Sequence, residues 1–497
     1  MQDTTGSSAR CGRMVKLLLA ASLLAAAGCA PLPRTDSAPT LKKVEELGSS
    51  NSFTAPLAAW PGDGWWRAYG DAQLDALIGE GLRGSPDLDL AQARLQAALG
   101  VVRSAHAARM PEVTGTASFT EQKQSYNNLI PKDALPQGWN DYGLATVNLT
   151  YELDFWGKNR AALAAALSEE RAAEVEVDQA RLIISTSVAS AYAELVNLYT
   201  LRDNAAATLD LRTKTVSLFR QRYDFGLETL SSVREVEARE HGAQADLLAI
   251  DERIGLQRNA IAALIGAGPD RGLAITRPTA QFPGSQGLPQ DLALELLGRR
   301  PDIIAARLRT EAAARRIDQA KAGFYPSVNL IGLIGVQSLG IANLTKSGSD
   351  LGSIGPAISL PIFNTERLQG QLRGAHADYD AAVATYNATL SNALREVADA
   401  ATSRRSLDGE LTASRAAVAA AAEAHQIVSR RYQGALATYL DVLTAEDQLI
   451  SAQRADAELE TRALILDVAL VRALGGGFSP ASLGAGSKTP TVEPKHS

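Results

Sequence analysis

A duplication that runs through the whole chain limits the folds open to it more than any other feature. A Pro-Asp pair at Pro86 is followed 25 residues later by Pro111, and a second pair at Pro301 is followed 25 residues later by Pro326. A tyrosine-to-valine spacing of 10 residues also recurs further along both copies. Two copies of one unit, each too extended to enclose a core alone, favour a tubular or solenoid architecture over a compact enzyme domain.

Each copy also contains stretches that predict very long helices. No proline occurs between Pro136 and Pro269 or between Pro361 and Pro480, and residues 158–225 lack glycine as well. Alanine, leucine, glutamate and arginine, which are strong helix formers, dominate these stretches. At about 1.5 Å per residue, such a stretch makes a rod of roughly 100 Å, and a rod of that length calls for coiled-coil or barrel packing.

Apolar side chains on the first predicted rod recur with helical spacing. One face carries Ile184, Val188, Tyr192, Leu195 and Tyr199. A neighbouring seam carries Leu182, Ala189 and Val196. Two adjacent seams are typical of a helix that touches two neighbours, as in a cylinder of helices. A simple dimeric coiled coil is the alternative, and it explains the helices but not the strands described next.

Four segments read as β-strands, two in each copy. Residues 146–155 and 113–122 alternate apolar and polar side chains, and residues 327–337 and 353–362 do so less cleanly, with Pro356 in the last segment. Roughly ten alternating residues match a tilted strand that crosses a bilayer, with apolar side chains toward lipid and polar ones toward a lumen. A soluble, half-buried hairpin is the alternative interpretation of any one of these strands.

Four strands cannot stand alone in lipid, because their open edges would leave backbone groups without hydrogen-bond partners. The smallest membrane barrels need about eight strands. One chain must therefore share its barrel with other copies. The sequence predicts an oligomer without fixing the number of its copies.

The first residues predict export and a lipid anchor. Residues 14–29 have a positive start, a short apolar run and a small-residue cleavage site, which is typical of a secretory signal. The run "LAAAGC" that ends at Cys29 resembles the bacterial lipobox, in which the cysteine carries lipid. We expect residues 1–28 to be a lipoprotein signal peptide and residues 29–55 a lipidated segment. An ordinary cleaved signal is the alternative, and translation from Met14 is an alternative start.

Composition disfavours several other classes of protein. The net charge of −6 argues against a nucleic-acid surface. Cys11 lies in or before the signal, so the mature chain keeps no cysteine pair. The run "GAGPDRG" at 266–272 lacks the Lys-Ser/Thr of a phosphate loop, and the five histidines form no His-Glu-x-x-His pattern. We therefore expect no catalytic site, no metal site, no cofactor and no enzyme activity.

Several motifs, taken in order, resemble the TolC superfamily of outer-membrane efflux channels, in particular the lipoprotein branch with OprM and NodT-type proteins. They are Trp65-Trp66 with "GDAQLDALI", the two Pro-Asp openings, "SLPIF" at 359–363, "RYDFGLETLSSV" at 222–233 and "RYQGALATYLDVL" at 431–443. The resemblance covers roughly residues 56–475.

The resemblance implies a mainly α chain with membrane β-structure. A long α-helical barrel would be continuous with a 12-stranded transmembrane β-barrel, which a homotrimer builds from four strands per chain. The two efflux repeats would be residues 56–275 and 276–475, followed by a disordered tail at 476–497. The two tryptophans would anchor the N-terminal segment on a collar.

The resemblance also implies a function. The trimer would be the channel of a tripartite efflux pump, lodged in outer-membrane lipid. It would passively conduct small molecules, such as drugs and toxic compounds, from an inner-membrane RND-type transporter through a periplasmic adaptor. A type I protein secretion duct and a structural periplasmic coiled-coil lipoprotein are the alternatives. A periplasmic hydrolase is a weaker one, because no catalytic set is apparent.

The helix reversals at the periplasmic tips are the candidate functional site. These turns are marked by Arg222, Tyr223, Gly226, Arg431 and Tyr432. In the family such turns close the channel and dock onto the adaptor.

Within the second turn, Asp441 matches the first of two acidic positions that ring the constriction in TolC. We hypothesise that three copies of Asp441 face the axis and favour cations or zwitterions. A solvated charge at a helix start is the alternative. An apolar plug is predicted at Tyr439 and Leu440, and the matching gate positions in the other turn are Leu230, Ser231 and Ser232. Because Ala437 and Thr444 replace family residues, we expect a lock of hydrogen bonds and apolar contacts.

Overall fold

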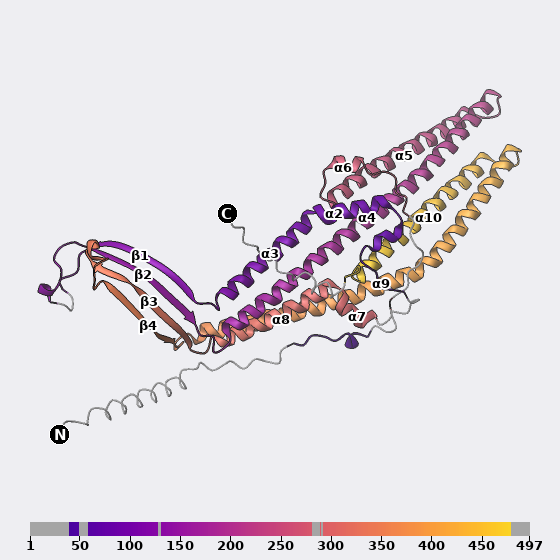
Figure 1. Cartoon of the computed structure of the whole chain (residues 1–497). Coiled ribbons are helices and arrows are strands. Elements are labelled where there is room, and N and C mark those ends of the chain that lie inside the picture. The colour runs from indigo at the N-terminus through magenta and orange to yellow at the C-terminus, as the bar shows by residue number, and fades with distance from the viewer. Residues whose placement is uncertain (1–38, 49–57, 128–130, 281–288, 290–291, 479–497) are drawn as a thin grey trace, which may run out of the picture. The chain divides into compact units, whose positions relative to one another are not determined.

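The chain is mainly helical, with one small β-sheet, as the sequence predicts. The structure is a computed structural model and describes residues 39–48, 58–127, 131–280, 289 and 292–478. The α-helices are α2 (Ala72–Gly84), α3 (Pro86–Ala107), α4 (Lys158–Asp224), α5 (Leu230–Leu264), α6 (Pro269–Leu273), α7 (Leu292–Arg299), α8 (Pro301–Ala322), α9 (Thr365–Gln433) and α10 (Tyr439–Ala473). The strands are β1 (Glu112–Gln122), β2 (Asn140–Glu152), β3 (Ser327–Leu339) and β4 (Asp350–Ser359). Figure 1 shows the duplicated order of these elements along the chain.

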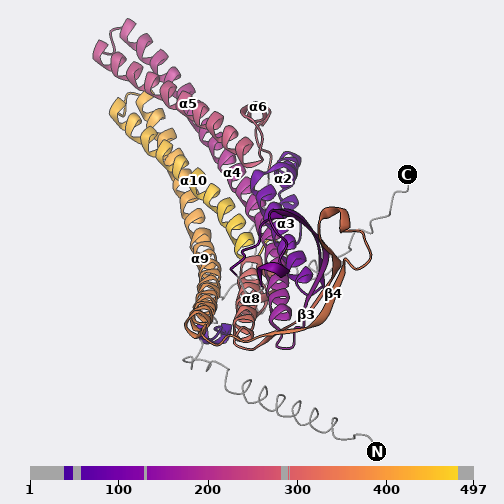
Figure 2. The ribbon, with the colours of Figure 1, turned by 90° about the vertical axis from the view of Figure 1, so that its left-hand side faces the viewer.

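The described residues form two compact units. The first contains Gln96–Ala172 and Ala306–Tyr386, and with them the whole sheet. The second contains Lys42–Leu95, Ala173–Ala305 and the chain from Asn387 onward. In the second unit, α4 with α5 and α9 with α10 form two antiparallel hairpins, which both views show side by side (Figures 1 and 2).

The predicted long rods are confirmed. Helix α4 is 67 residues long and α9 is 69 residues long, in agreement with the proline-free stretches. The predicted apolar face of α4 is buried, since Ile184, Val188, Tyr192 and Leu195 are at most 4% exposed and share one core with Leu74 and Ile78 of α2. Gly81 of α2 leaves room for the Ile184 side chain there, since a Cβ on Gly81 would lie 3.1 Å from the Cγ2 methyl of Ile184. The core of the second unit therefore forms where α2 crosses the long helix.

Asp71 joins three separate segments to this core. Its Oδ1 accepts the backbone N–H groups of Gln73 and Leu74 and so caps the start of α2. Its Oδ2 accepts the hydroxyl of Tyr192 at 2.7 Å and the backbone N–H of Thr279 at 2.8 Å. Partial burial of Asp71 acts to raise its pKa, but these hydrogen bonds outweigh burial and hold the pKa of the carboxyl below its usual value. The carboxylate thus ties the joint between the two repeats to α2 and α4.

The four predicted strands form one antiparallel sheet in the order β1-β2-β3-β4. The register places Val147 opposite Gly115 on β1 and opposite Ile334 on β3. Ile334 in turn lies opposite Gly352 on β4. Each repeat therefore contributes one hairpin, β1-β2 or β3-β4. The pairing of β2 with β3 joins the two hairpins into a single sheet.

The predicted bounds of two strands were wrong at both ends. The second strand runs from Asn140 to Glu152 and not over residues 146–155, and the fourth runs from Asp350 to Ser359 and not over residues 353–362. The physical reason at β2 is the helix that follows. The carboxylate of Asp154 accepts the backbone N–H groups of Asn159 and Arg160, at 3.2 and 2.9 Å, and caps α4.

The chain packs beyond α10 for a few residues more. Gly475, Gly476 and Gly477 all have positive φ. A Cβ on Gly477 would lie 2.4 Å from the backbone carbonyl carbon of Gly62, so only glycine fits this approach. The predicted tail at 476–497 therefore begins with packed residues, and its part from 479 onward lies outside the described residues.

Candidate functional site

The two faces of the sheet differ sharply in polarity. The face that carries Val147 and Ile334 is apolar and open to solvent in a single copy, with these side chains 47% and 67% exposed. Other exposed apolar residues share it by register: Val113, Phe119, Ile354 and Ile358. On the opposite face, the hydroxyls of Thr116 and Thr146 are hydrogen-bonded at 3.0 Å, and the amide of Asn148 donates to Thr116 at 2.8 Å. The predicted alternation thus yields one apolar face and one face that is polar and hydrogen-bonded on β1 and β2, although β3 adds exposed Ile331 and Leu339 to it.

Both edges of this sheet are open in a single copy. Strand β1 is exposed along its whole length, and β4 pairs only with β3 among the described residues. The Gln337 backbone N–H donates to the Ser349 carbonyl, which places the odd-numbered residues of β4 in hydrogen-bonded pairs with β3. The nitrogen of Pro356 therefore lies on the free edge, where it has no hydrogen to donate.

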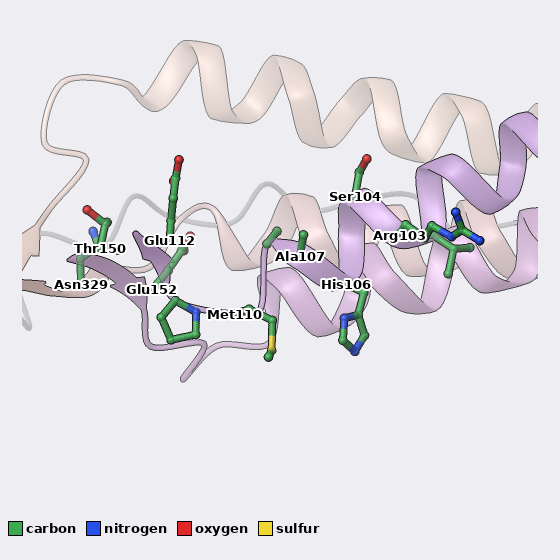
Figure 3. Close-up of a pocket in the computed structure, with 12 residues that line it drawn as sticks. Arg103, Ser104, His106, Ala107, Met110, Glu112, Thr150, Glu152 and Asn329 are labelled. Atoms are coloured by element: carbon green, nitrogen blue, oxygen red, sulfur yellow. The ribbon is translucent and has the colours of Figure 1, made fainter. Parts of the chain in front are cut away.

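A large groove lies where the end of α3 meets the ends of β1, β2 and β3. Its volume is about 1040 Å³, and Arg103, His106 and Met110 line it beside Glu112 and Glu152 at the ends of β1 and β2 (Figure 3). Figure 3 shows Glu112 and Ser104 pointing to one side and His106 and Met110 to the other. Two apolar residues near this end of α3, Val101 and Met110, are 58% and 57% exposed. The ends of these strands and of α3 thus leave a mixed apolar and charged surface uncovered.

The two helix tips repeat one turn geometry, as the duplication predicts. In the first, the Leu227 N–H donates to the Arg222 carbonyl at 2.8 Å, and Gly226 has a φ of 70°. In the second, the Leu436 N–H donates to the Arg431 carbonyl at 2.8 Å, and Ala435 has a φ of 57°. Both are helix ends closed through a left-handed residue. The second repeat therefore has alanine, Ala435, at the left-handed position where the first repeat has glycine, Gly226.

The hairpins touch each other near these tips through an aromatic cluster. The ring centroid of Phe219 on α4 lies 4.1 Å from that of Tyr439 and 6.0 Å from that of Tyr432. The Tyr432 hydroxyl donates to the Glu228 carboxylate at 3.0 Å, and the Arg222 guanidinium lies 5.1 Å above the Tyr432 ring. Burial and the Glu228 carboxylate raise the pKa of Tyr432 to about 12. Hydrogen bonds and ring contacts hold the tips together within one chain.

Charged residues add a second contact between the hairpins. Arg212 on α4 pairs with Glu446 at 3.3 Å and with Asp447 at 3.1 Å, and Arg239 on α5 pairs with Asp447 at 3.1 Å. Glu446 is 1% exposed, and burial raises the pKa of its carboxyl. Sequence reasoning missed this cluster and Phe219, because their partners are more than 200 residues away. The only local signal is the Val216-x-x-Phe219 spacing on α4.

The predicted gate residues occupy different environments. Asp441 is exposed and forms a capping box with Thr438, and hydrogen bonds from the Thr438 hydroxyl and backbone N–H lower the pKa of its carboxyl. Tyr439 lies in the aromatic cluster, whereas Leu440 and Leu230 are 67% and 50% exposed. Exposed Ser231 and half-buried Ser232 complete the predicted set, with the Ser232 N–H donating to the Thr229 hydroxyl. The predicted lipidation site, Cys29, lies outside the described residues.

Two further properties of the described residues concern their helices and their metal-ligating side chains. None of their helices combines the length and the apolar content needed to cross a bilayer. Nor do the described residues bring three or more His, Cys, Asp or Glu side chains together in a way that could hold a metal ion.

Comparisons with known proteins give a consistent result. The profile of the family described as "Outer membrane efflux protein" matches residues 77–267 and 292–476. The multidrug resistance outer membrane protein MdtP of Escherichia coli K12 is 31% identical over 94% of this chain and 98% of its own length. The fusaric acid resistance protein FusA of Burkholderia cepacia is 34% identical over 75% of this chain and 71% of its own length.

A solved structure extends the comparison to the fold. The outer membrane protein VceC of Vibrio cholerae superposes with a TM-score of 0.80 and 50% identity, over 84% of this chain and 100% of that one. The matched family consists of outer-membrane channels and not of enzymes. The sequence motifs, the amphipathic sheet, the paired helical hairpins and these likenesses agree, and the chain belongs to the outer membrane efflux protein family.

Proposed function

We propose that three copies of this chain form the outer-membrane channel of a tripartite efflux pump. Small molecules, with drugs and toxic compounds as the expected cargo, pass through it from an inner-membrane RND-type transporter by way of a periplasmic adaptor. The names of MdtP and FusA, which refer to multidrug and fusaric acid resistance, support this class of cargo.

The sheet is the observation that carries the proposal. Its outer face exposes Val147, Ile334 and Ile354, and both of its edges are open in one copy. An apolar face suits lipid, and open edges in lipid require strands from other copies. Pairing β4 of one copy with β1 of the next closes a barrel without leaving an edge.

The helix tips form the periplasmic gate in this proposal. The contact of Phe219 with Tyr432 and Tyr439, and the hydrogen bond from Tyr432 to Glu228, hold the two hairpins of each copy in the closed arrangement. Three Asp441 carboxylates face the axis beside Leu440. The capping box fixes the backbone around Asp441, and its lowered pKa keeps the carboxylate charged at neutral pH.

The outer ends of the same turns dock onto the adaptor. They carry three large apolar side chains, Phe225, Leu227 and Leu436, which are 72%, 64% and 72% exposed. Apolar groups this exposed at a turn favour contact with another protein. Lipid attached to Cys29 anchors the N-terminus in the outer membrane.

Single-channel conductance in a planar bilayer, with the oligomer mass measured in the same detergent, tests the proposal. We expect a trimer with small, cation-biased and mostly closed pores. Asp441→Ala should weaken the cation preference, and mass spectrometry of the mature N-terminus should find acylated Cys29. A monomer or dimer that does not conduct contradicts the channel. Unchanged conductance and selectivity in Asp441→Ala contradict the acidic ring alone.

A further inference from the structure

A cavity in the second unit lies between α4, α9 and α10 and has the volume of a small-molecule site. Its volume is about 390 Å³, and ligand pockets typically span roughly 300–1,000 Å³. Val196, Leu411 and Leu464 give it an apolar wall. Its charged lining residues are Arg404, Arg415, Glu460 and Asp467.

Three of the four charged groups already have protein partners. Arg415 pairs with Glu460 at 3.1 Å. The Asp467 carboxylate accepts the Tyr69 hydroxyl at 2.6 Å, deep in the fold. Both carboxylates of the cavity are therefore engaged, and neither is left to hold a cationic ligand.

Arg404 differs from these groups. Its Nε is shielded from solvent and has no acceptor among the residues that the structure describes. Arg404 also makes no ion pair within the described part of the chain, although it lies near enough to Asp467 to lower the pKa of that carboxyl against the stronger effect of burial. A buried donor without an acceptor costs on the order of 1–3 kcal/mol, and more when it is charged. Arg404 is thus the charged residue of the cavity lining that has no carboxylate partner among the described residues, and an anion in the cavity would supply one.

We propose that this cavity binds a small apolar carboxylic acid as its anion. The carboxylate lies on the two terminal nitrogens of the Arg404 guanidinium, whose planar geometry matches that of a carboxylate. The hydrocarbon part packs against Leu411 and Leu464, which a chloride ion or a water molecule would leave uncovered. The site is separate from the gate and from the membrane sheet, and it extends the proposed function to ligand recognition in the channel wall.

Calorimetric titration of the full-length protein in detergent tests this site. Sodium benzoate is the probe, and benzylamine is its cationic counterpart of similar size. We expect saturable benzoate binding and none of benzylamine. Arg404→Gln should weaken benzoate binding by about tenfold or more, as expected for loss of a hydrogen bond to a charged group. Arg405→Gln, an exposed neighbour on the same helix, should leave it unchanged.

Filling the cavity by Leu464→Trp, with Arg404 intact, should also abolish binding, which keeps the test valid if Arg404→Gln does not fold. Equal affinity in Arg404→Gln, preference for benzylamine, or no benzoate binding by the unaltered protein each overturns the site. Conductance of the same samples separates the two proposals. A conducting protein that ignores benzoate refutes the cavity and leaves the channel standing.

Discussion

At the scale of single residues, the left-handed turn at each tip shows how the two repeats have diverged. Gly226 and Ala435 occupy equivalent positions with φ of 70° and 57°. A Cβ in this region costs roughly 1–2 kcal/mol. We expect Ala435→Gly to raise the free energy of unfolding by about 1 kcal/mol and Gly226→Ala to lower it by a similar amount. Thermal midpoints from circular dichroism would measure both.

Gly370 provides a control, because here a substitution by alanine should raise stability and not lower it. It lies within α9, and an added Cβ would meet nothing within 4 Å. Gly370→Ala should therefore stabilise the helix by about 0.5–1 kcal/mol. If Gly226→Ala and Gly370→Ala shift the midpoint in the same direction, left-handed strain does not explain the difference between the repeats.

Asp71 makes a pH-dependent contribution to stability. Hydrogen bonds hold its folded pKa below the usual 3.8, so its stabilisation is present above that value and is lost as the pH falls through the folded pKa. At pH 7 we expect Asp71→Asn to lower the free energy of unfolding by about 2 kcal/mol, as charge-assisted hydrogen bonds are lost. Melting curves from pH 7 to pH 3 should show the two proteins converge. Asp89→Asn, exposed on α3, is the control and should change the free energy of unfolding at pH 7 by about 0.5 kcal/mol or less.

At the scale of elements, the two hairpins depend on the buried pair of Arg212 and Glu446. Arg212→Ala would leave a carboxylate that is 1% exposed without its partner, and we expect a loss of about 3–5 kcal/mol. Adding Glu446→Leu should recover much of this loss, because it removes the stranded charge. Lys214→Ala breaks an exposed pair with Asp210 and should change stability by about 0.5 kcal/mol or less. Chemical denaturation of the unaltered protein, Arg212→Ala, the double variant and Lys214→Ala would measure these differences. A double variant no more stable than Arg212→Ala would contradict the role given to the unpaired charge of Glu446.

Elements were more predictable than their contacts. The absence of proline and glycine over residues 158–225 sufficed to predict α4, because helix propensity is a local property. Alternation revealed all four strands for the same reason. The end of β2 was misplaced because Asp154 continues the alternating pattern while its carboxylate caps the next helix. The contact of Phe219 with Tyr432 joins separate repeats, and no local pattern encodes it.

At the scale of the whole molecule, the outer face of the sheet should control membrane assembly. Ile334→Lys puts a charge on the apolar face, which costs about 2–4 kcal/mol near the middle of a bilayer. We expect less of this variant in the outer-membrane fraction and less heat-resistant oligomer on gels. Gln337→Lys, exposed on the opposite face of the same strand, should assemble normally. Equal assembly of the two variants would contradict a lipid-facing role for Ile334.

Pro356 affects which strands can pair with the free edge of β4 before the chain assembles with other copies. In the proposed trimer, a copy that has not yet assembled has an unpaired edge on β4, and an unpaired edge readily pairs with strands of other proteins. The missing hydrogen on the outer side of Pro356 interrupts its row of donors, so an arbitrary peptide gains only a broken ladder there. In the proposed trimer, a second copy of the chain makes other contacts that offset the one missing hydrogen bond. An unrelated peptide makes no such contacts. Pro356 thus disfavours pairing of β4 with unrelated strands before the copies assemble.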